Sequence, residues 1–317
     1  MAYTDISQGS SRRLCQAVSS GYVAFGVLSV DQEARVVGKT SRGIFIQSAS
    51  KWIIFISCEP FRGPVTITID ECCEFLQKIN REKPVRISSR RLIFPDAGLI
   101  ISTQNSAVWR SPLPALPPLP DAERQTRLYL TARQIMDSKK DAGLAPMLPF
   151  LLKFPEPNYR STQALSPFQV HMICLYEELR SSARPNATRF LTSLLGNGGG
   201  LTPSGDDFVI GFLLAFNRWR EILFPGHDPE ELNRIVVESA YKKTTTLSAN
   251  LIECASQGQG DERLIAALDW LMSGTSPNGG EIDELLGWGS SSGGDVFAGF
   301  VAALSFQAEI NGQVKIL

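Results

Sequence analysis

Histidine is scarce in this chain of 317 residues, which contains only His171 and His227. The first lies in a stretch with the pattern of an amphipathic helix, and the second follows a Pro-Gly turn. Neither has neighbours with the spacing of a zinc site or of a Ser-His-Asp triad. The sequence therefore disfavours an active site built on histidine.

Cysteine is also sparse, and no two cysteines form a CxxC pair. In a chain of this size we expect reduced, mainly buried thiols rather than a disulfide framework. The adjacent Cys72 and Cys73 offer two soft metal ligands, but no further ligand lies near them in the sequence, which disfavours a metal there. The six cysteines are Cys15, Cys58, Cys72, Cys73, Cys174 and Cys254.

The chain has no excess charge of one sign, with 31 Lys and Arg against 32 Asp and Glu. No overall field therefore attracts it to nucleic acid or to an anionic membrane. It lacks an apolar run near the ~20 residues that span a bilayer, and Met1 to Arg13 contain no apolar signal core. This composition predicts a soluble, cytoplasmic protein without nucleic-acid or membrane partners.

Short runs of β-branched and aromatic residues separated by turns extend from Gly21 to Trp109. This pattern predicts a β-rich barrel or sandwich. One helix is expected within it, from Glu71 to Asn80, with Asp70 as its N-cap. The expected strands are Tyr22 to Val30, Ala34 to Gly38, Gly43 to Gln47, Trp52 to Cys58, Val65 to Ile69, Pro84 to Ile87, Arg91 to Phe94 and Leu99 to Ser102.

Five prolines in the segment 111–120 exclude a helix or a central strand there. We expect a stiff connector at 112–120 between a β-rich domain at 1–111 and a mainly helical domain at 121–317. The predicted fold class is thus α+β, with the functional site in the helical domain. The expected helices are 121–138, 166–182, 186–195, 206–221, 229–242, 246–257, 261–272, 281–286 and 295–309.

A Gly/Ser-rich turn that leads into an acidic helix start occurs twice, at 196–207 and at 287–295. Each copy opens on Leu-Leu-Gly and continues into an apolar helix. Gly211 and Gly299, each four residues before an alanine, predict that these helices pack closely on each other or on equivalent neighbours. Two copies in one format indicate a pseudo-symmetric site. The aligned positions are Ser204 and Ser292, Gly205 and Gly293, Asp207 and Asp295, Gly211 and Gly299, and Ala215 and Ala303.

The two helix starts fit more than one kind of chemistry. Free N–H groups and a partial positive charge at helix N-termini favour a bound anion. The carboxylates of Asp206, Asp207 and Asp295 repel an anion and fit three interpretations. They are helix-capping groups, acceptors for an amide or hydroxyl of the substrate, or ligands of a divalent metal at Asp206 and Asp207.

A third polar segment, 242–248, also precedes an apolar helix. Its hydroxyls suit N-capping. Alternatively, they form a hydroxyl and N–H cradle that completes an oxyanion or phosphate site, with Thr245, Thr246 and Ser248 as candidates. No Gly-Lys-Ser/Thr ends the turn at 196–207 and no strand is expected before it, so neither a P-loop nor a dinucleotide fingerprint is present.

At these residues the sequence resembles the AllH-like family of bacterial proteins, which are sometimes labelled as carboxylases. One member is assigned as a subunit of oxamate carbamoyltransferase in allantoin catabolism, a part of purine metabolism. The resemblance rests on segments 200–208, 245–248 and 287–295, and more weakly on 107–109. It implies transfer of a carbamoyl group between phosphate and oxamate, with oxalurate as the carbamoylated partner, in an assembly with other subunits. The Ser-Thr-Arg-Thr and His-Pro-x-Gln signatures of aspartate- and ornithine-type transcarbamoylases are absent, which implies an unrelated scaffold or a need for partner subunits.

Two other functions stay open, a carboxylase-like one-carbon enzyme that binds bicarbonate and a non-catalytic subunit whose loops shape an interface. We expect one pocket for a small anionic substrate: carbamoyl phosphate, oxamate, oxalurate or phosphate. Its predicted catalytic residues are Asp207 and Asp295. The predicted binding residues are Thr202, Ser204, Gly205, Asp206, Thr245, Thr246, Ser248, Ser290, Ser291, Ser292 and Gly293.

Overall fold

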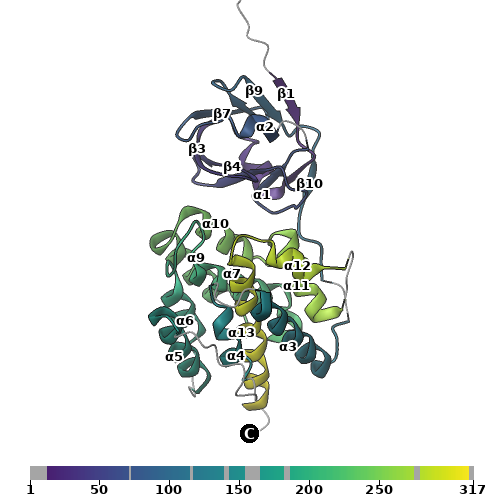
Figure 1. Cartoon of the computed structure of the whole chain (residues 1–317), viewed down its shortest axis with the longest axis vertical. Helices are drawn as coiled ribbons and strands as arrows, with labels where there is room; N and C mark the ends of the chain where they lie inside the picture. Colours follow the sequence, from purple (N-terminus) through teal and green to yellow (C-terminus); the bar gives the residue numbers. More distant parts are fainter. Residues whose placement is uncertain are drawn as a thin grey trace, which may run out of the picture. The chain divides into compact units, whose positions relative to one another are not determined.

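The computed structural model describes residues 13–70, 73–114, 117–138, 143–153, 165–181, 186–274 and 279–313. The chain divides into two compact units, 1–110 and 111–317, and each has a hydrophobic core of its own. The first unit contains a curled sheet of ten strands, a half-barrel, and the second is mostly helical (Figure 1). The predicted α+β class is confirmed.

The sheet curls because one continuous stretch of chain pairs with strands near both edges of the sheet. The strand order is β1-β9-β8-β7-β3-β4-β5-β6-β2-β10, and β1 and β2 follow each other directly in the sequence. Between them, the N–H of Ala17 donates to Ser102 O at 2.9 Å and that of Val18 donates to Thr68 O at 2.9 Å. The strands are β1 Arg13–Gln16, β2 Ser19–Gly21, β3 Gln32–Thr40, β4 Gly43–Ser48, β5 Ile53–Ser57, β6 Thr66–Thr68, β7 Pro84–Ser88, β8 Arg91–Phe94, β9 Leu99–Ser102 and β10 Ala107–Trp109.

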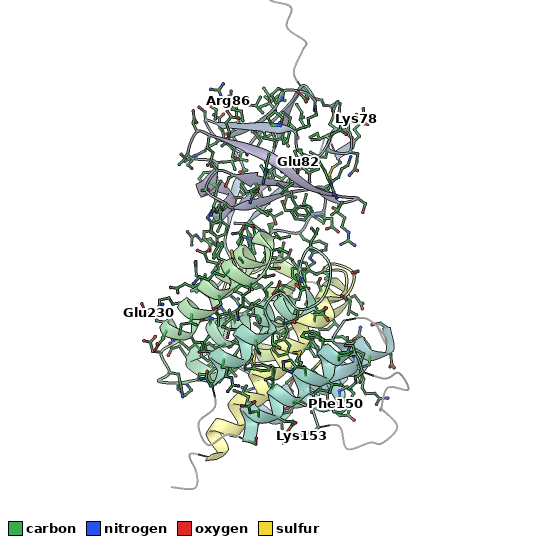
Figure 2. The ribbon with its side chains drawn as sticks, turned by 90° about the vertical axis from the view of Figure 1, so that its left-hand side faces the viewer. Lys78, Glu82, Arg86, Phe150, Lys153 and Glu230 are labelled. Carbon is green, nitrogen blue, oxygen red and sulfur yellow. A yellow bond between two sulfur atoms is a disulfide. The ribbon has the colours of Figure 1, made fainter. Side chains whose placement is uncertain are left out.

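Side chains that alternate along the strands form the core of this unit. Ile44 and Ile46 of β4 have no exposed surface, as expected for one face of a pleated strand. Charged residues such as Lys78, Glu82 and Arg86 lie on the outside of the unit (Figure 2). The strands predicted from Ala34 onward are all present.

The strand predicted at Tyr22 to Val30 is wrong, because Tyr22–Val27 form helix α1. The N–H groups of Val23 and Ala24 donate to Pro64 O at 3.1 and 3.2 Å, and Ala24 and Leu28 are fully buried four residues apart. Packing of one helical face thus overrides the strand propensity of this apolar run. Helix α2, Cys73–Leu76, is shorter than predicted, and Glu71 and Cys72 lie outside the described residues.

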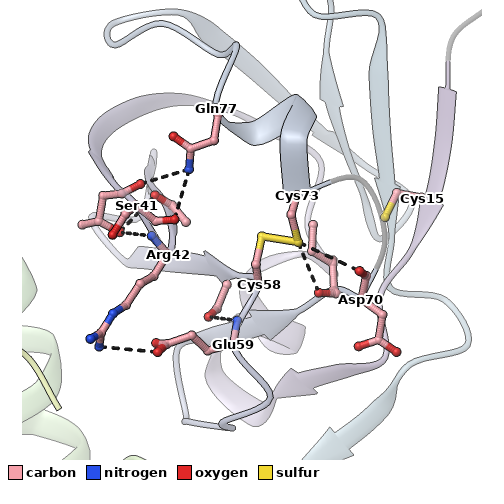
Figure 3. The surroundings of a disulfide bond; sticks show 12 residues. Cys15, Ser41, Arg42, Cys58, Glu59, Asp70, Cys73 and Gln77 are labelled. Atoms are coloured by element: carbon pink, nitrogen blue, oxygen red, sulfur yellow. Dashed lines mark hydrogen bonds and ion pairs between the residues drawn. A yellow bond between two sulfur atoms is a disulfide. The ribbon is translucent and has the colours of Figure 1, made fainter. Parts of the chain in front are cut away.

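A disulfide joins Cys58, after β5, to Cys73 at the start of α2 (Figure 3). The expectation that all six thiols are reduced is therefore wrong for this pair. Strand β6 pairs in parallel with β5, and the chain that leaves β6 brings Cys73 back to Cys58. Cys15 and Cys254 are buried, as expected, whereas Cys174 is exposed.

Two long apolar helices, α7 (Ser204–Arg218) and α13 (Ser292–Gln313), pack against each other in the helical unit (Figure 1). They approach so closely that a Cβ on Gly211 would lie 2.0 Å from Val296 O, and one on Gly299 would lie 2.1 Å from Phe208 O. The prediction that these helices pack on each other at their glycines is confirmed. No other residue type fits there without separating the backbones.

The other predicted helices are present, with ends that differ by a few residues. The described part of the helical unit contains three further short helices that were not predicted: η1 Ala145–Met147, α4 Leu148–Leu151 and α8 Arg220–Leu223. Segments 111–114 and 117–120 form neither helix nor strand, and within the helical unit Leu119 N–H donates to Met272 O at 2.7 Å. Within the described ranges, no helix has the length and apolarity that a membrane crossing requires. The remaining helices are α3 Asp121–Ser138, α5 Pro167–Ser181, α6 Ala187–Leu194, α9 Glu230–Lys243, α10 Thr246–Ala255, α11 Glu262–Ser273 and α12 Glu281–Leu286.

Candidate functional site

The two repeated turns share one backbone geometry, the first between α6 and α7 and the second between α12 and α13. In the first turn, Asn197 N–H donates to Leu194 O at 3.2 Å and Gly205 N–H donates to Asn197 O at 2.9 Å. The second turn is three residues shorter between its Leu-Leu-Gly and its Ser-Gly, yet it repeats both bonds. These join Trp288 N–H to Leu285 O at 3.0 Å and Gly293 N–H to Trp288 O at 3.0 Å.

Gly205 and Gly293 hold each helix start against the helix that precedes it. A Cβ on Gly205 would lie 2.2 Å from Leu194 O, and one on Gly293 would lie 1.9 Å from Leu285 O. These two predicted binding residues are buried, and their role in the structure is close backbone packing.

Further N–H groups at both helix starts already have acceptors. Those of Asp206 and Asp207 donate to Pro203 O at 2.9 and 3.1 Å, and those of Gly294 and Asp295 donate to Ser291 O at 2.9 and 3.1 Å. The prediction of free N–H groups that bind an anion is therefore wrong for these residues and for the two glycines before them. The side chains of the site are instead acidic groups and hydroxyls.

The side chains of the two starts bond across the helix pair. The hydroxyl of Ser292 bonds to Asp207 and that of Ser204 bonds to Asp295, so that each start supplies the partner of the other. Thr202 Oγ1 adds a bond to Asp207 Oδ2 at 3.2 Å and lies 3.4 Å from Ser292 Oγ. We call Ser204, Asp207, Ser292 and Asp295 the crossed Ser-Asp pairs. Both carboxyls are fully buried, whereas the hydroxyl residues are partly exposed.

The two carboxyls differ in their remaining contacts. Asp295 Oδ1 accepts the backbone N–H of Leu144 at 2.5 Å, and its Oδ2 accepts the hydroxyl of Ser291 at 3.3 Å. Asp207 Oδ1 is buried and has no hydrogen-bond partner among the described residues. The backbone reaches Asp295 because Gly143, with a φ of +55°, has no side chain, and a Cβ there would lie 2.1 Å from Asp295 Oδ1.

Burial shifts the protonation of both carboxyls. It raises the pKa of Asp207 well above its usual value of 3.8, and the negative charges of Asp295 and Asp206 act in the same direction. It raises the pKa of Asp295 to about 6, although the bonds from Leu144, Ser204 and Ser291 favour the charged form. Two buried acids with raised pKa values are suited to accept a proton or to accept a hydrogen bond from an N–H donor.

Asp206 belongs to a separate cluster at the start of α10. Its carboxyl accepts Gly196 N–H at 2.7 Å and the hydroxyls of Thr244 and Ser248. Burial raises the pKa of Asp206, and these bonds oppose the shift. The cluster ties α10 to the turn before α7, which is a structural role.

The structure thus separates the predicted binding residues into groups. Thr245 caps α10 by accepting Ser248 N–H at 3.1 Å, and it donates to Leu201 O at 2.9 Å. Thr246 is the first residue of α10, and Ser290 is exposed in the second turn. The predicted residues that the recorded contacts join are Thr202, Ser204, Asp207, Ser291, Ser292 and Asp295.

Two residues that bond to the buried carboxyls were not predicted from the sequence. Leu144 lies 151 residues before Asp295 in the chain, and no motif marks it. Thr244 lies in the polar segment that the sequence singled out, but the prediction chose the hydroxyls that follow it.

No group of three or more His, Cys, Asp and Glu side chains that could hold a metal ion occurs in the described parts of the chain. Asp206 bonds to the α10 cluster, whereas Asp207 bonds to Thr202 and to Ser292 of α13. The two neighbouring carboxyls therefore do not converge, and the arrangement does not favour a divalent ion shared between them.

A cavity of about 550 Å³ lies at the other end of α7, beside Asn217 and Arg218. Its polar groups have partners within the protein. Arg218 bonds to Asp269 at 2.7 and 2.6 Å, and the side-chain amides of Asn217 and Asn233 bond to each other. The length of α7 places this cavity roughly 20 Å from the crossed Ser-Asp pairs.

Comparison with known protein families identifies the segment that contains these helix starts. Residues 194–304 match the model of the family described as oxamate carbamoyltransferase subunit AllH. The resemblance seen in the sequence is confirmed. The AllH match begins at the last residue of α6 and includes both turns, the crossed Ser-Asp pairs and Asp206, whereas Gly143 and Leu144 lie outside it. No curated protein and no solved structure matches the chain.

Proposed function

We propose that this chain is a subunit of an oxamate carbamoyltransferase-like enzyme and that the crossed Ser-Asp pairs contribute to its substrate site. One observation carries the proposal: the segment that matches the AllH family brings two buried carboxyls and two partly exposed hydroxyls together at its repeated helix starts. Buried acids that repel each other destabilise a fold. Groups with pKa values shifted in this way concentrate at functional sites, which favours a functional role over helix capping.

In the proposed reaction the amide nitrogen of oxamate attacks the carbonyl carbon of carbamoyl phosphate. A C–N bond forms, the C–O bond to phosphate breaks, and the proton lost by nitrogen leaves with phosphate, which gives oxalurate. A buried carboxyl of the crossed Ser-Asp pairs accepts N–H groups of the substrates, and the hydroxyls of Thr202, Ser204 and Ser292 bind their oxygen atoms. Positioning of this kind accelerates a reaction without a covalent intermediate.

The negative charges that act on Asp207 come from Asp295 and Asp206. We therefore assign the charged phosphate and oxalyl groups to the partly exposed hydroxyls and to other subunits of the assembly. An acidic site that binds two anionic substrates needs such partners, in agreement with the description of the matched family as a subunit.

Thermal unfolding of the full chain tests the proposal. We expect carbamoyl phosphate, oxamate or oxalurate to raise Tm, because a ligand at ~100 times its Kd stabilises by about 2.7 kcal/mol, which for a unit of this size is roughly 5–10 °C. The Asp207→Asn variant should lose the shift. The control variant Asp283→Asn, at an exposed position of α12, should keep it.

Two other results would contradict the proposal. A shift with bicarbonate but not with carbamoyl phosphate or oxamate favours a carboxylase-like enzyme. No shift with any of these ligands favours a subunit without a small-molecule site of its own.

A further inference from the structure

The crossed Ser-Asp pairs contain two carboxyls in equivalent positions, and among the described residues only Asp207 has an oxygen without a hydrogen-bond partner. Each carboxyl accepts a hydroxyl from the opposite helix start. On Asp295, Oδ1 also accepts the backbone N–H of Leu144 at 2.5 Å. On Asp207, Oδ1 is fully buried and unpartnered among the described residues. The pseudo-symmetry therefore shows which bond Asp207 lacks.

The donor at Asp295 is a peptide amide that the chain can bring there only because residue 143 is a glycine. Gly143 adopts a φ of +55°, and any side chain at this position would collide with Asp295 Oδ1. A planar N–H donor is thus the group that this buried acid accepts. The chain provides such a donor for Asp295, and a ligand can provide it for Asp207.

We propose that Asp207 Oδ1 binds the N–H of an amide or carbamoyl group of the substrate, in the position that Leu144 N–H takes at Asp295. Asp295 is then a positioning residue, which orients Ser204 and anchors the start of α13. This inference rests on the proposed function and deepens it by assigning unequal roles to the two predicted catalytic residues. The partly exposed hydroxyls nearest to Asp207 are Thr202 and Ser292, and we place the entry of the ligand there.

An unpartnered buried acceptor discriminates strongly between ligands. A ligand that brings an N–H satisfies Asp207 Oδ1, whereas an isosteric ligand with a methyl group leaves it unpaired in an apolar surrounding. Sites built to bond a polar hydrogen reject analogues that lack it by large factors. We therefore expect at least about tenfold tighter binding of the amide member of an isosteric pair.

Binding of an N–H donor also favours the charged form of Asp207. The carboxyl faces Asp295 on α13 and Asp206 on its own helix, and both raise its pKa in the absence of ligand. Binding of the amide ligand should therefore lower the pKa of Asp207, and binding of the methyl analogue should not.

Isothermal titration calorimetry of the full chain with two isosteric pairs tests the inference. Carbamoyl phosphate is compared with acetyl phosphate, and oxamate with pyruvate, so that in each pair a methyl group replaces the NH2. The wild-type chain should prefer the amide member at least about tenfold. In Asp207→Asn, the side-chain oxygen accepts the hydroxyl of Thr202, as Oδ2 does in the wild type, and an NH2 takes the place of Oδ1, so the preference should disappear. Asp295→Asn is the matched control and should keep the preference in spite of lower stability.

The outcomes separate this inference from the proposed function. Equal binding of both members of a pair by the wild-type chain, or a preference that survives in Asp207→Asn, overturns the inference and leaves the substrate site in place. Loss of the preference in Asp295→Asn alone assigns the role to the other acid and also overturns it. No binding of any of the four ligands overturns both.

A second measurement needs no variant, in case Asp207→Asn does not fold. The wild-type chain is titrated with oxamate and with pyruvate in buffers of different ionisation enthalpy. Over a range of pH, greater release of protons with oxamate than with pyruvate supports the inference, and equal proton exchange with both ligands throughout that range contradicts it.

Discussion

Single buried carboxyls hold the two helix starts of this chain in place. Asp206 accepts a backbone N–H from the first turn and two hydroxyls from the start of α10. Asp207 and Asp295 join the starts of α7 and α13 to each other through hydroxyls. Three neighbouring acids at one end of the helical unit thus have three different sets of partners, and substitutions should separate their roles.

We expect Asp206→Ala to destabilise the helical unit without a specific effect on ligands. It leaves Gly196 N–H and the Thr244 hydroxyl without their acceptor in a buried place, at a cost of about 2–4 kcal/mol. Urea unfolding followed by circular dichroism measures this loss. The control Asp137→Ala, at an exposed position of α3, should stay within about 0.5 kcal/mol of wild type. Equal stability of the two variants would mean that the Asp206 bonds do not support the fold.

Asp295 should make the helical unit less stable as the pH rises. Its pKa is about 6 in the folded chain against a usual 3.8, so the folded state binds more protons between these values. The contribution of Asp295 to stability is therefore fully present below about pH 4 and is lost as the pH rises through 6; it amounts to at most about 3 kcal/mol at 1.36 kcal/mol per pKa unit.

The difference between wild type and Asp295→Asn reports the titration of Asp295 together with its effect on the pKa of Asp207, because all other carboxyls are common to both proteins. Urea unfolding at pH 4, 5, 6 and 7 should show the advantage of wild type shrinking as the pH rises. Parallel pH profiles for the two proteins would contradict the raised pKa of Asp295.

At the scale of single residues, the repeated motif predicted the clustered carboxyls. Contacts between residues far apart in the sequence were not predictable. The alignment of Asp207 with Asp295 predicts one shared cluster, because equivalent ends of packed helices meet. The hydrogen bond from Leu144 to Asp295 joins positions 151 residues apart. Its donor is a backbone N–H, so no particular residue type marks it in the sequence. The N–H groups expected to be free are satisfied by Pro203 and Ser291, whose carbonyls accept them within the turns.

The pair of helices α7 and α13 depends on the absence of two side chains. In Gly211→Ala and Gly299→Ala, the new methyl group meets a backbone oxygen at 2.0 and 2.1 Å, so the helices must separate. We expect a loss of about 1–3 kcal/mol or more from this overpacking, which exceeds the gain of about 1 kcal/mol that alanine brings to a helix.

Gly294→Ala is the matched control on α13. A Cβ at this position meets Ile135 at 3.5 Å, which is ordinary contact, so this variant should be as stable as wild type or slightly more so. Thermal unfolding of the three variants measures the difference. Equal Tm values for Gly294→Ala and Gly299→Ala would contradict the close crossing.

Helices and strands with a clear hydrophobic periodicity were predictable from the sequence. Structural features that depend on long-range packing were not. The helices of the second unit carry apolar periods and polar turns, and their predicted ends agree with the structure to within a few residues. Tyr22–Val27 is apolar and looks like a strand, but it folds as a helix because Ala24 and Leu28 fill the core on one face. The Cys58–Cys73 disulfide depends on how β5 and β6 pair, which residue types alone do not reveal.

The whole molecule has two separate hydrophobic cores, one in residues 1–110 and one in residues 111–317. Since each unit buries its own apolar residues, we expect calorimetry to show two unfolding transitions rather than one. A fragment of residues 111–317 should keep the helical circular dichroism of its unit and unfold cooperatively. A fragment that is unfolded on its own would show that the helical unit needs the sheet unit.

The crossed Ser-Asp pairs have the contact pattern of an isologous dimer interface. In such an interface, a residue of one copy contacts a different residue of the other copy, and the same two residues meet again with the copies exchanged. Here both copies lie in one chain, in which Ser204 meets Asp295 and Ser292 meets Asp207. In a true dimer of identical chains, every substitution would appear on both sides of the axis. In a single chain the two sides can differ, and here they do: one acid accepts the backbone amide of Leu144, and the other has an oxygen without a partner among the described residues. Joining the copies in one polypeptide is what permits a symmetric scaffold to contain an asymmetric site.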